Sequence, residues 1–292
     1  MDTRFLETFV AVCDHGSMAE AGRSLNLTAA AIAQRIHALE EEIGVPLVSR
    51  SGHSVKITEA GMAILDQTRD FIHKIGDLKA LASGDQLNGD LRLGAFSTAL
   101  TGILPEVLSR IASKYPGFNI SIVPGTSADL YAKVHSGELD SAIIIQPSFA
   151  LPKSLDWKTI REERLILLTA SSMSVKSPNA TLKTQPFVRY GRGTWGGRLI
   201  DGYLRKMGIR PHERFQLSSL DAIAVLVDRG LGVALVPDWA PPWPEGLSLS
   251  KWELPDRSFD RRVGVIWAVA SLRIRFIRAF VTEAASTGVH NK

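Results

Sequence analysis

Cysteine is almost absent from this chain of 292 residues, because Cys13 is the only one. A single cysteine excludes an internal disulfide and any cysteine-rich metal site. Cys13 falls in a predicted amphipathic helix with no second cysteine nearby, which favours a buried structural thiol over a redox sensor. The seven histidines are scattered, and none has the HxxxH or HxH spacing of a metal-binding pair. We therefore expect no metal, no cofactor and no enzymatic activity.

Long apolar runs are missing as well. No uninterrupted stretch approaches the roughly 18–20 apolar residues of a membrane helix, and the N-terminus lacks the pattern of a signal peptide. Hydrophobic residues make up 45% of the chain and charged residues 22%, as in ordinary globular proteins. We expect a cytoplasmic protein of two or three domains without a membrane partner.

Positive charge is scarce in the N-terminal third. Residues 1–89 carry eight Lys and Arg against twelve Asp and Glu, whereas the remaining residues carry 26 against 18. If the N-terminal part binds nucleic acid, it must do so through a few well-placed basic residues and not as a basic domain.

The N-terminal segment predicts three short helices. The first ends at Gly16, and Ser17 with Glu20 forms a capping box for the second. Thr28 is the expected N-cap of a third helix that ends at Gly44. Two short helices joined by so tight a turn are typical of the helix-turn-helix, whose second helix enters the DNA major groove.

A hairpin and a long helix are predicted next. The β-prone runs 47–49 and 55–57 flank a turn, as in the wing of winged helix-turn-helix domains. The long helix begins near Thr58, and its seam positions have heptad spacing: Ile64, Thr68, Phe71, Ile75, Leu78 and Ala82. A helix packed on its own domain would show a similar pattern. We favour a dimerisation helix, because a flexible break at 83–85 follows it.

From residue 90 onward, strand patterns alternate with helix patterns. This alternation predicts an α/β domain with a parallel sheet. The expected strands are 91–95, 119–123, 141–145, 165–169, 187–190, 233–237 and 263–269, and the expected helices are 104–114, 129–135, 198–207, 219–229 and 274–285.

Residue types at fixed spacing in about the first 65 positions follow a single register: Phe9, Val12, Gly16, Ser17, Ala21, Leu25, Ile36, Leu39, Glu40, Gly44, Leu47, Arg50, Thr58, Ala60 and Gly61. This register resembles the N-terminal signature of LysR-type transcriptional regulators. The rest of the chain is similar to that family in architecture, with weaker echoes at 137–140 and 230–237.

The resemblance implies an α/β multidomain protein. It would have a winged helix-turn-helix at 1–58, a linker and dimerisation helix at 59–88, and a two-lobed, periplasmic-binding-protein-like effector domain at 89–292. Lobe I is expected at about 89–161 with 267–292, and lobe II at about 162–266. The implied function is sequence-specific binding of double-stranded DNA to regulate transcription, controlled by a small-molecule effector. The protein would form homodimers or dimers of dimers and would act on RNA polymerase. The alternative is a solute-binding protein or enzyme of the same fold with an accessory DNA-binding domain.

The third helix has two unlike faces. Ile32, Ile36 and Leu39 share one face and should pack on the first two helices. The opposite face is rich in alanine, which is equally typical of plain packing. On a recognition helix, alanine permits close approach and contact with a thymine methyl, and Gln34 can pair with adenine. Relatives commonly carry glutamine, proline and serine where this chain has alanine.

The expected DNA contacts combine this small face with nearby polar and basic side chains. They are Ser17, Arg23, Thr28, Ala29, Ala30, Ala33, Gln34, Arg35, His37, Arg50, His53 and Lys56. Those near the wing would hold phosphates or enter a minor groove. The acidic run 40–42 is expected to point away from DNA. Gly22 and Val48 depart from the family pattern, and we interpret both as tolerated packing changes.

The resemblance also implies an effector site in the cleft between the lobes, at strand ends and helix N-termini, where anions are favoured. Two hydroxyl pairs match by position, although ordinary N-caps would look the same. A glycine-rich loop of the second lobe would add arginines suited to a carboxylate, unless it is only a mobile surface loop. The expected contacts are Ser97, Thr98, Thr126, Ser127, Arg189, Arg192, Thr194 and Trp195. We predict an organic acid as the effector.

Overall fold

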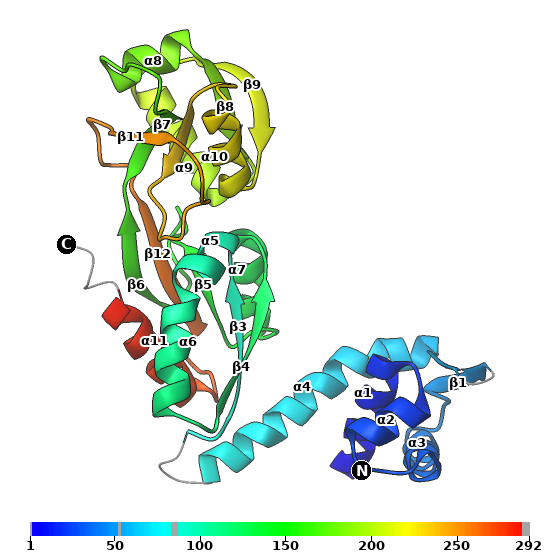
Figure 1. Cartoon of the computed structure of the whole chain (residues 1–292). Helices are drawn as coiled ribbons and strands as arrows, with labels where there is room; N and C mark the ends of the chain where they lie inside the picture. The colour runs from blue at the N-terminus through cyan, green and yellow to red at the C-terminus, as the bar shows by residue number, and fades with distance from the viewer. Residues whose placement is uncertain (1, 52–53, 83–86, 288–292) are drawn as a thin grey trace. The chain divides into compact units, whose positions relative to one another are not determined.

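The computed structural model describes residues 2–51, 54–82 and 87–287 (Figure 1). The chain divides into two units, Met1–Gly84 and Asp85–Lys292. The first is mostly helical, and the second alternates strands with helices in two lobes. None of the helices within the described ranges is both long and apolar enough to cross a membrane.

The first unit has a three-helix core, a hairpin and a long helix. Its elements are α1 (Thr3–His15), α2 (Met18–Ser24), α3 (Ala29–Ile43), β1 (Val48–Ser51), β2 (Ser54–Ile57) and α4 (Glu59–Ala82). Phe9 and Val12 of α1 are buried in one cluster with Ile32, Ile36 and Leu39 of α3. This packing confirms the apolar seam predicted on α3.

The turn between α2 and α3 requires glycine at position 22. The Leu27 amide donates to the Gly22 carbonyl over 2.8 Å, and Asn26 adopts a left-handed backbone with φ 53°. A Cβ at Gly22 would lie 2.6 Å from the Leu27 carbonyl oxygen. Our interpretation of Gly22 as a merely tolerated change is therefore wrong. Thr28 caps α3 as predicted, accepting from the Ala31 amide over 3.1 Å.

The start of α2 differs from the predicted capping box. The Ser17 side chain makes no capping hydrogen bond, and Glu20 forms an ion pair with Arg23 instead. Residues three apart face each other on a helix, so the guanidinium competes successfully for the carboxylate that would have reached back to Ser17.

The seam of α4 is only partly buried within the first unit. Ile64 packs on the core of the unit, and Thr68 is buried with its hydroxyl donating to the Ile64 carbonyl over 2.8 Å. Further along, Phe71 is 52% exposed. The first half of α4 therefore packs on its own domain, the alternative that the sequence left open, and Phe71 remains accessible to a partner. The side chains of Leu78 and Ala82 lie outside the described residues.

The second unit has two lobes built on separate sheets (Figure 1). Lobe I contains β3 (Gly89–Ala95), α5 (Ser97–Gly102), α6 (Leu104–Lys114), β4 (Phe118–Pro124), α7 (Ser127–Ser136), β5 (Ser141–Ile145), β6 (Leu155–Glu163), β12 (Arg261–Ala268) and α11 (Ile274–Thr287). Lobe II contains β7 (Leu165–Ala170), α8 (Pro178–Thr184), β8 (Pro186–Tyr190), α9 (Trp195–Lys206), β9 (His212–Leu217), α10 (Leu220–Asp228), β10 (Ala234–Pro237) and β11 (Leu249–Glu253). The sequence did not predict α5, β6, α8, β9 or β11.

The prediction of a parallel sheet is correct only in part. Lobe I has the order β4-β3-β5-β12-β6, in which β3 is parallel to β4 and β5, while β12 is antiparallel to β5 and β6. In lobe II, β7 is antiparallel to β10 and β11, and β8 is parallel to β9. The chain leaves lobe I through β6 and returns through β12, and two neighbouring strands that lead in opposite directions between lobes must be antiparallel.

The same pairing corrects the expected boundary between the lobes. Strand β12 begins at Arg261 and pairs with β6 along its whole length, whereas the sequence assigned residues up to 266 to lobe II. Strand β6 likewise continues to Glu163 within the lobe I sheet. Lobe II therefore comprises residues 164–260.

Candidate functional site

The outer face of α3 is exposed, small and mostly neutral. Thr28, Ala29, Ala30 and Gln34 are exposed at the N-terminal half of the helix, as the sequence predicted. The other two members of this face are Ala33, which is half-buried, and His37, whose Nε2 lies 3.4 Å from Glu41 Oε1. Such a face can approach a DNA groove closely.

The basic residues near this face are partly engaged within the unit. Arg23 pairs with Glu20, and Arg35 donates from Nη1 to the buried Thr8 hydroxyl over 3.4 Å. Lys56 is exposed on β2. Ser17 is half-buried at the start of α2, Arg50 lies on β1, and the Arg50 side chain and all of His53 lie outside the described residues.

Glu40 has a structural role that the sequence did not indicate. Its Oε1 accepts from the amides of Leu47 and Val48 over 2.7 and 3.0 Å. The carboxylate thereby ties the end of α3 to the start of the hairpin, whereas Glu41 and Glu42 are exposed.

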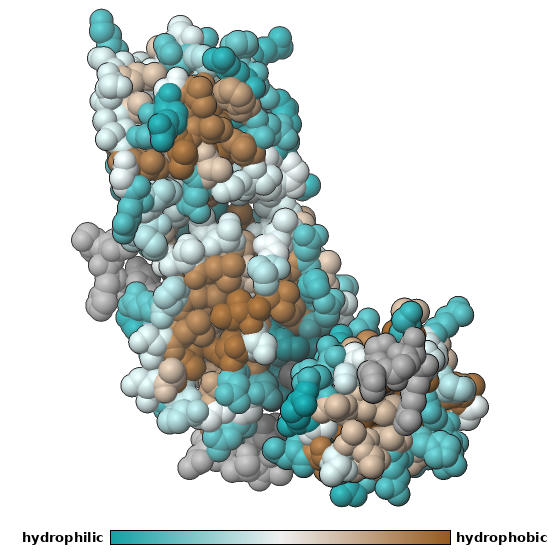
Figure 2. All heavy atoms as spheres, turned by 45° about the vertical axis from the view of Figure 1, so that its right-hand side comes forward, coloured by the Kyte–Doolittle hydropathy of each residue, from teal (hydrophilic) through white to brown (hydrophobic). Residues whose placement is uncertain are grey.

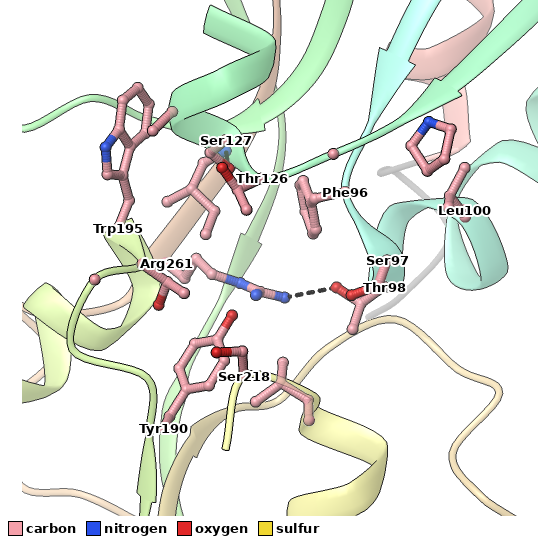
Figure 3. A pocket seen from close by; sticks show the side chains of 17 residues that line it. Phe96, Ser97, Thr98, Leu100, Thr126, Ser127, Tyr190, Trp195, Ser218 and Arg261 are labelled. Atoms are coloured by element: carbon pink, nitrogen blue, oxygen red, sulfur yellow. Dashed lines mark hydrogen bonds between the residues drawn. The ribbon is translucent and has the colours of Figure 1, made fainter. Parts of the chain in front are cut away.

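A cavity of about 200 Å³ lies between the lobes of the second unit (Figure 3). Six of the eight expected effector contacts line it: Ser97, Thr98, Thr126, Ser127, Thr194 and Trp195. The other two, Arg189 and Arg192, do not line it.

Arg189 and Arg192 pair with acidic side chains of lobe II instead. Arg189 is 1% exposed and forms ion pairs with Asp201 and, over 3.7 Å, with Glu213. Burial lowers the pKa of its guanidinium. Arg192 is exposed and donates to both carboxylate oxygens of Glu213, over 2.6 and 2.8 Å. Both arginines therefore connect β8 and its loop to α9 and β9, which corrects their expected placement in the cleft.

Arg261 is the pocket cation that the sequence reasoning missed. It comes from the first position of β12 and is 1% exposed. Its Nε donates to Glu163 Oε2 over 2.6 Å, and its Nη2 donates to Thr98 Oγ1 over 3.2 Å. In Figure 3 the guanidinium reaches toward Thr98, with Phe96 above and Tyr190 below it. The only local indication in the sequence was the pair of arginines, Arg261 and Arg262, at the start of an apolar strand.

Three helices of lobe I and lobe II begin at this cavity. They are α7, α9 and α10, whose N-caps Thr126, Thr194 and Ser219 accept backbone amide hydrogens over 3.3, 2.9 and 3.2 Å. Thr126 is thus an N-cap, as the sequence allowed, and Thr194 of the glycine-rich loop is the N-cap of α9. Since helix N-termini carry partial positive charge, their convergence favours an anion in the cavity.

Trp195 joins the two lobes at the edge of the cavity. Its ring centroid lies 6.0 Å from that of Tyr131 on α7 and 5.9 Å from that of Phe149. Tyr131 and Phe149 contact each other edge to face at 5.3 Å. A residue of lobe II is thus packed into an aromatic cluster of lobe I.

No group of three His, Cys, Asp or Glu side chains that could hold a metal occurs in the part of the chain that the structure describes. Cys13 is half-buried in α1, and burial, with the neighbouring Asp14, raises the pKa of its thiol to about 11.

We expect Cys13 to be alkylated by iodoacetamide at about pH 8 at least roughly tenfold more slowly than free cysteine, because only the thiolate is the nucleophile. Mass spectrometry of the tryptic peptide 5–23 measures this rate. A rate equal to that of free cysteine would contradict the burial and reopen a redox role.

Two family models match the chain. The model described as "Bacterial regulatory helix-turn-helix protein, lysR family" matches residues 3–62. The model described as "LysR substrate binding domain" matches residues 84–288.

Similar proteins agree with these matches. The HTH-type transcriptional regulator GltR of Bacillus subtilis is 25% identical over 238 residues, covering 81% of this chain and 80% of GltR. The HTH-type transcriptional regulator IlvR of Caulobacter vibrioides is 30% identical over 244 residues, covering 81% of this chain and 82% of IlvR. The structure of a cysteine mutant of Corynebacterium glutamicum OxyR has a TM-score of 0.66 at 26% identity, covering 100% of this chain and 97% of that one.

These matches support a regulator over a solute-binding protein or an enzyme with an accessory domain. Together with the helix-turn-helix unit and the two-lobed unit with its cavity, they identify the protein: it belongs to the LysR family and is a DNA-binding transcriptional regulator with an effector-binding domain.

Proposed function

We propose that this regulator responds to a small organic acid bound in the cavity between lobes I and II. The observation that carries the proposal is the convergence of three helix N-termini and the Arg261 guanidinium on one cavity. Arginine and helix N-termini both suit a carboxylate. The exposed hydroxyls of Ser97 and Ser218 are further donors at the cavity wall.

The size and lining of the cavity limit the effector further. The cavity volume of about 200 Å³ lies below the roughly 300–1,000 Å³ of typical small-molecule pockets, which favours a small effector. Phe96, Tyr190 and Trp195 supply apolar and aromatic surface. These features favour a compact acid with an apolar or ring portion.

The DNA-contact set is proposed to be the outer face of α3 with the basic residues around it. Gln34 would pair with adenine and the alanines would contact thymine methyls, while Lys56 and Arg50 would hold phosphates. The protein would act by binding chromosomal DNA in the cytoplasm and changing the access of RNA polymerase to the promoter. It would bind the effector without catalysing a reaction of it.

Self-association is proposed for both units. Phe71 of α4 is exposed, and so are Ile122 of β4 and Phe215 of β9. Figure 2 shows an apolar patch on the visible face of each lobe. Exposed apolar patches of this kind are typical of protein interfaces, which fits a homodimer or a dimer of dimers.

The effector proposal is tested by thermal unfolding with a panel of small carboxylic acids and the matching neutral amides. An acid present at about a hundredfold its Kd should raise the Tm by roughly 5 °C, because binding to the native state alone stabilises it. Trp195→Ala should abolish the shift. Arg192→Ala should retain it, since Arg192 pairs with Glu213 outside the cavity.

Two results would contradict this proposal. If amides raised the Tm as well as acids, the effector would not be an anion. If Arg192→Ala removed the shift and Trp195→Ala did not, the effector would bind at the glycine-rich loop and not in the cavity.

A further inference from the structure

Glu163 is a buried carboxylate with partners from three parts of the effector unit. Its side chain is 1% exposed. Oε2 accepts from Arg261 Nε over 2.6 Å, while Oε1 accepts from the Ala240 amide over 3.2 Å and lies 3.3 Å from Arg161 Nε. The carboxylate therefore joins the pocket arginine to a backbone amide of lobe II.

The pair lies at the crossing between the lobes. Glu163 is the last residue of β6, Arg261 is the first residue of β12, and the two are directly opposite in the strand register. These strands carry the chain out of and back into lobe I. A change in the bond between the two side chains therefore acts where the lobes are connected.

Ala240 belongs to the proline- and tryptophan-rich segment 237–244, which contacts lobe I. A Cβ on Gly102 of α5 would collide with the Ala240 carbonyl, so the two backbones are in close contact. Trp239 is buried and stacks on Trp243 with ring centroids 3.6 Å apart. Glu163 thus connects the effector cavity to an aromatic segment at the interface of the lobes.

We propose that Glu163 is a positioning residue that serves as the internal counter-ion of Arg261 and competes with the anion of the effector for that guanidinium. This inference rests on the proposed function, because it assumes an anionic effector at Arg261. In the free protein Glu163 neutralises Arg261 and holds it against Thr98. A carboxylate that enters the cavity neutralises part of the Arg261 charge and so weakens the ion pair between Arg261 and Glu163. Because the same Glu163 carboxylate accepts from the Ala240 amide, that hydrogen bond weakens as well.

This exchange has two consequences. The effector affinity is set below what an unpaired buried arginine would give, because part of the guanidinium charge is already neutralised. Binding in the cavity also weakens the hydrogen bond between Glu163 and the Ala240 amide. The effector can thereby change how segment 237–244 packs between the lobes.

The test uses acetate as the probe, with acetamide as its neutral counterpart, on the full chain at constant ionic strength. Glu163→Gln keeps an oxygen for the Ala240 amide but removes the charge. It should lower the Tm by roughly 5 °C or more in acetate-free buffer, because a buried charge loses its partner. Acetate should reverse at least half of that loss, and acetamide should not.

Glu162→Gln is the matched control. Glu162 is the neighbouring residue, is exposed, and pairs with Arg262 over 3.0 Å at the surface. Glu162→Gln should change neither the Tm nor the response to acetate by more than the scatter of repeated wild-type measurements. A second readout is hydrogen exchange of segment 237–244, which acetate should accelerate in the wild type and leave unchanged in the double variant Glu163→Gln with Arg261→Gln.

The outcomes separate this inference from the proposed function. A larger acetate response in Glu163→Gln than in the wild type and Glu162→Gln supports the inference. Equal responses in all three overturn it, even if an organic acid still binds the wild type. If Glu163→Gln does not fold, its refolding yield is measured instead, and a yield that acetate raises no more than acetamide also overturns the inference. A wild type that binds no organic acid, beside a rescued Glu163→Gln, would refute only the proposed effector.

Discussion

Ala30→Glu on the outer face of α3 is expected to lower the affinity for operator DNA by roughly 100-fold, about 2.7 kcal/mol, because it adds a carboxylate to the face proposed to contact phosphates and bases. Ala30 is exposed in the first turn of α3. An acidic residue there is favourable for the helix itself, since it lies near the positive end of the helix dipole. Loss of DNA binding would therefore not be caused by unfolding.

Fluorescence anisotropy with the DNA upstream of the gene measures this affinity, and circular dichroism checks the fold. Ala180→Glu is the control, because Ala180 is also exposed near the start of a helix, α8 of lobe II. It should bind DNA as the wild type does. An unchanged affinity of Ala30→Glu would show that another surface contacts the operator.

Gly61→Ala is expected to destabilise the first unit by about 2 kcal/mol, although alanine is the better helix former by up to about 1 kcal/mol. A Cβ at Gly61 would collide with the Leu47 carbonyl oxygen. That oxygen also accepts from the Thr58 amide over 3.0 Å, and the Thr58 hydroxyl donates to the Pro46 carbonyl over 2.8 Å. The substitution would push α4 away from the segment that leads into the hairpin.

Hydrogen exchange of the α1–α3 amides measures this effect within the full chain, since these amides report on the first unit alone. Met62→Ala is the control, because Met62 is the next residue of α4 and is 59% exposed. Its exchange should match that of the wild type. Faster exchange in Met62→Ala than in Gly61→Ala would rule out the backbone contact as the reason for glycine.

The helices of the first unit could be predicted closely because their signals are local. The glycines that end α1 and α3 adopt left-handed backbones, with φ of 63° for Gly16 and 85° for Gly44, and Thr28 caps α3 with its own hydroxyl. Each of these depends on a few neighbouring residues. The capping box at Ser17 was predicted wrongly, because Arg23 offers Glu20 a stronger partner.

Strand direction in the second unit could be predicted only in part. Strands β3, β4 and β5 are parallel, as alternation with helices predicts, but β6 and β12 belong to the connection between the lobes. Nothing in the local pattern of residues 261–268 indicates that they return to lobe I. That assignment depends on a partner strand about a hundred residues earlier.

The sequence by itself determined the family, the helix-turn-helix with its apolar seam and small outer face, and the hydroxyl residues at the helix N-termini, because periodicity, caps and motif spacing are short-range properties. Only the tertiary structure decided which arginine faces the cavity. Arg189 and Arg192 pair with Asp201 and Glu213, whereas Arg261 meets a carboxylate 98 positions away and a hydroxyl 163 positions away. Burial and ion pairing of a charged side chain depend on such distant partners, and no local pattern of residues encodes them.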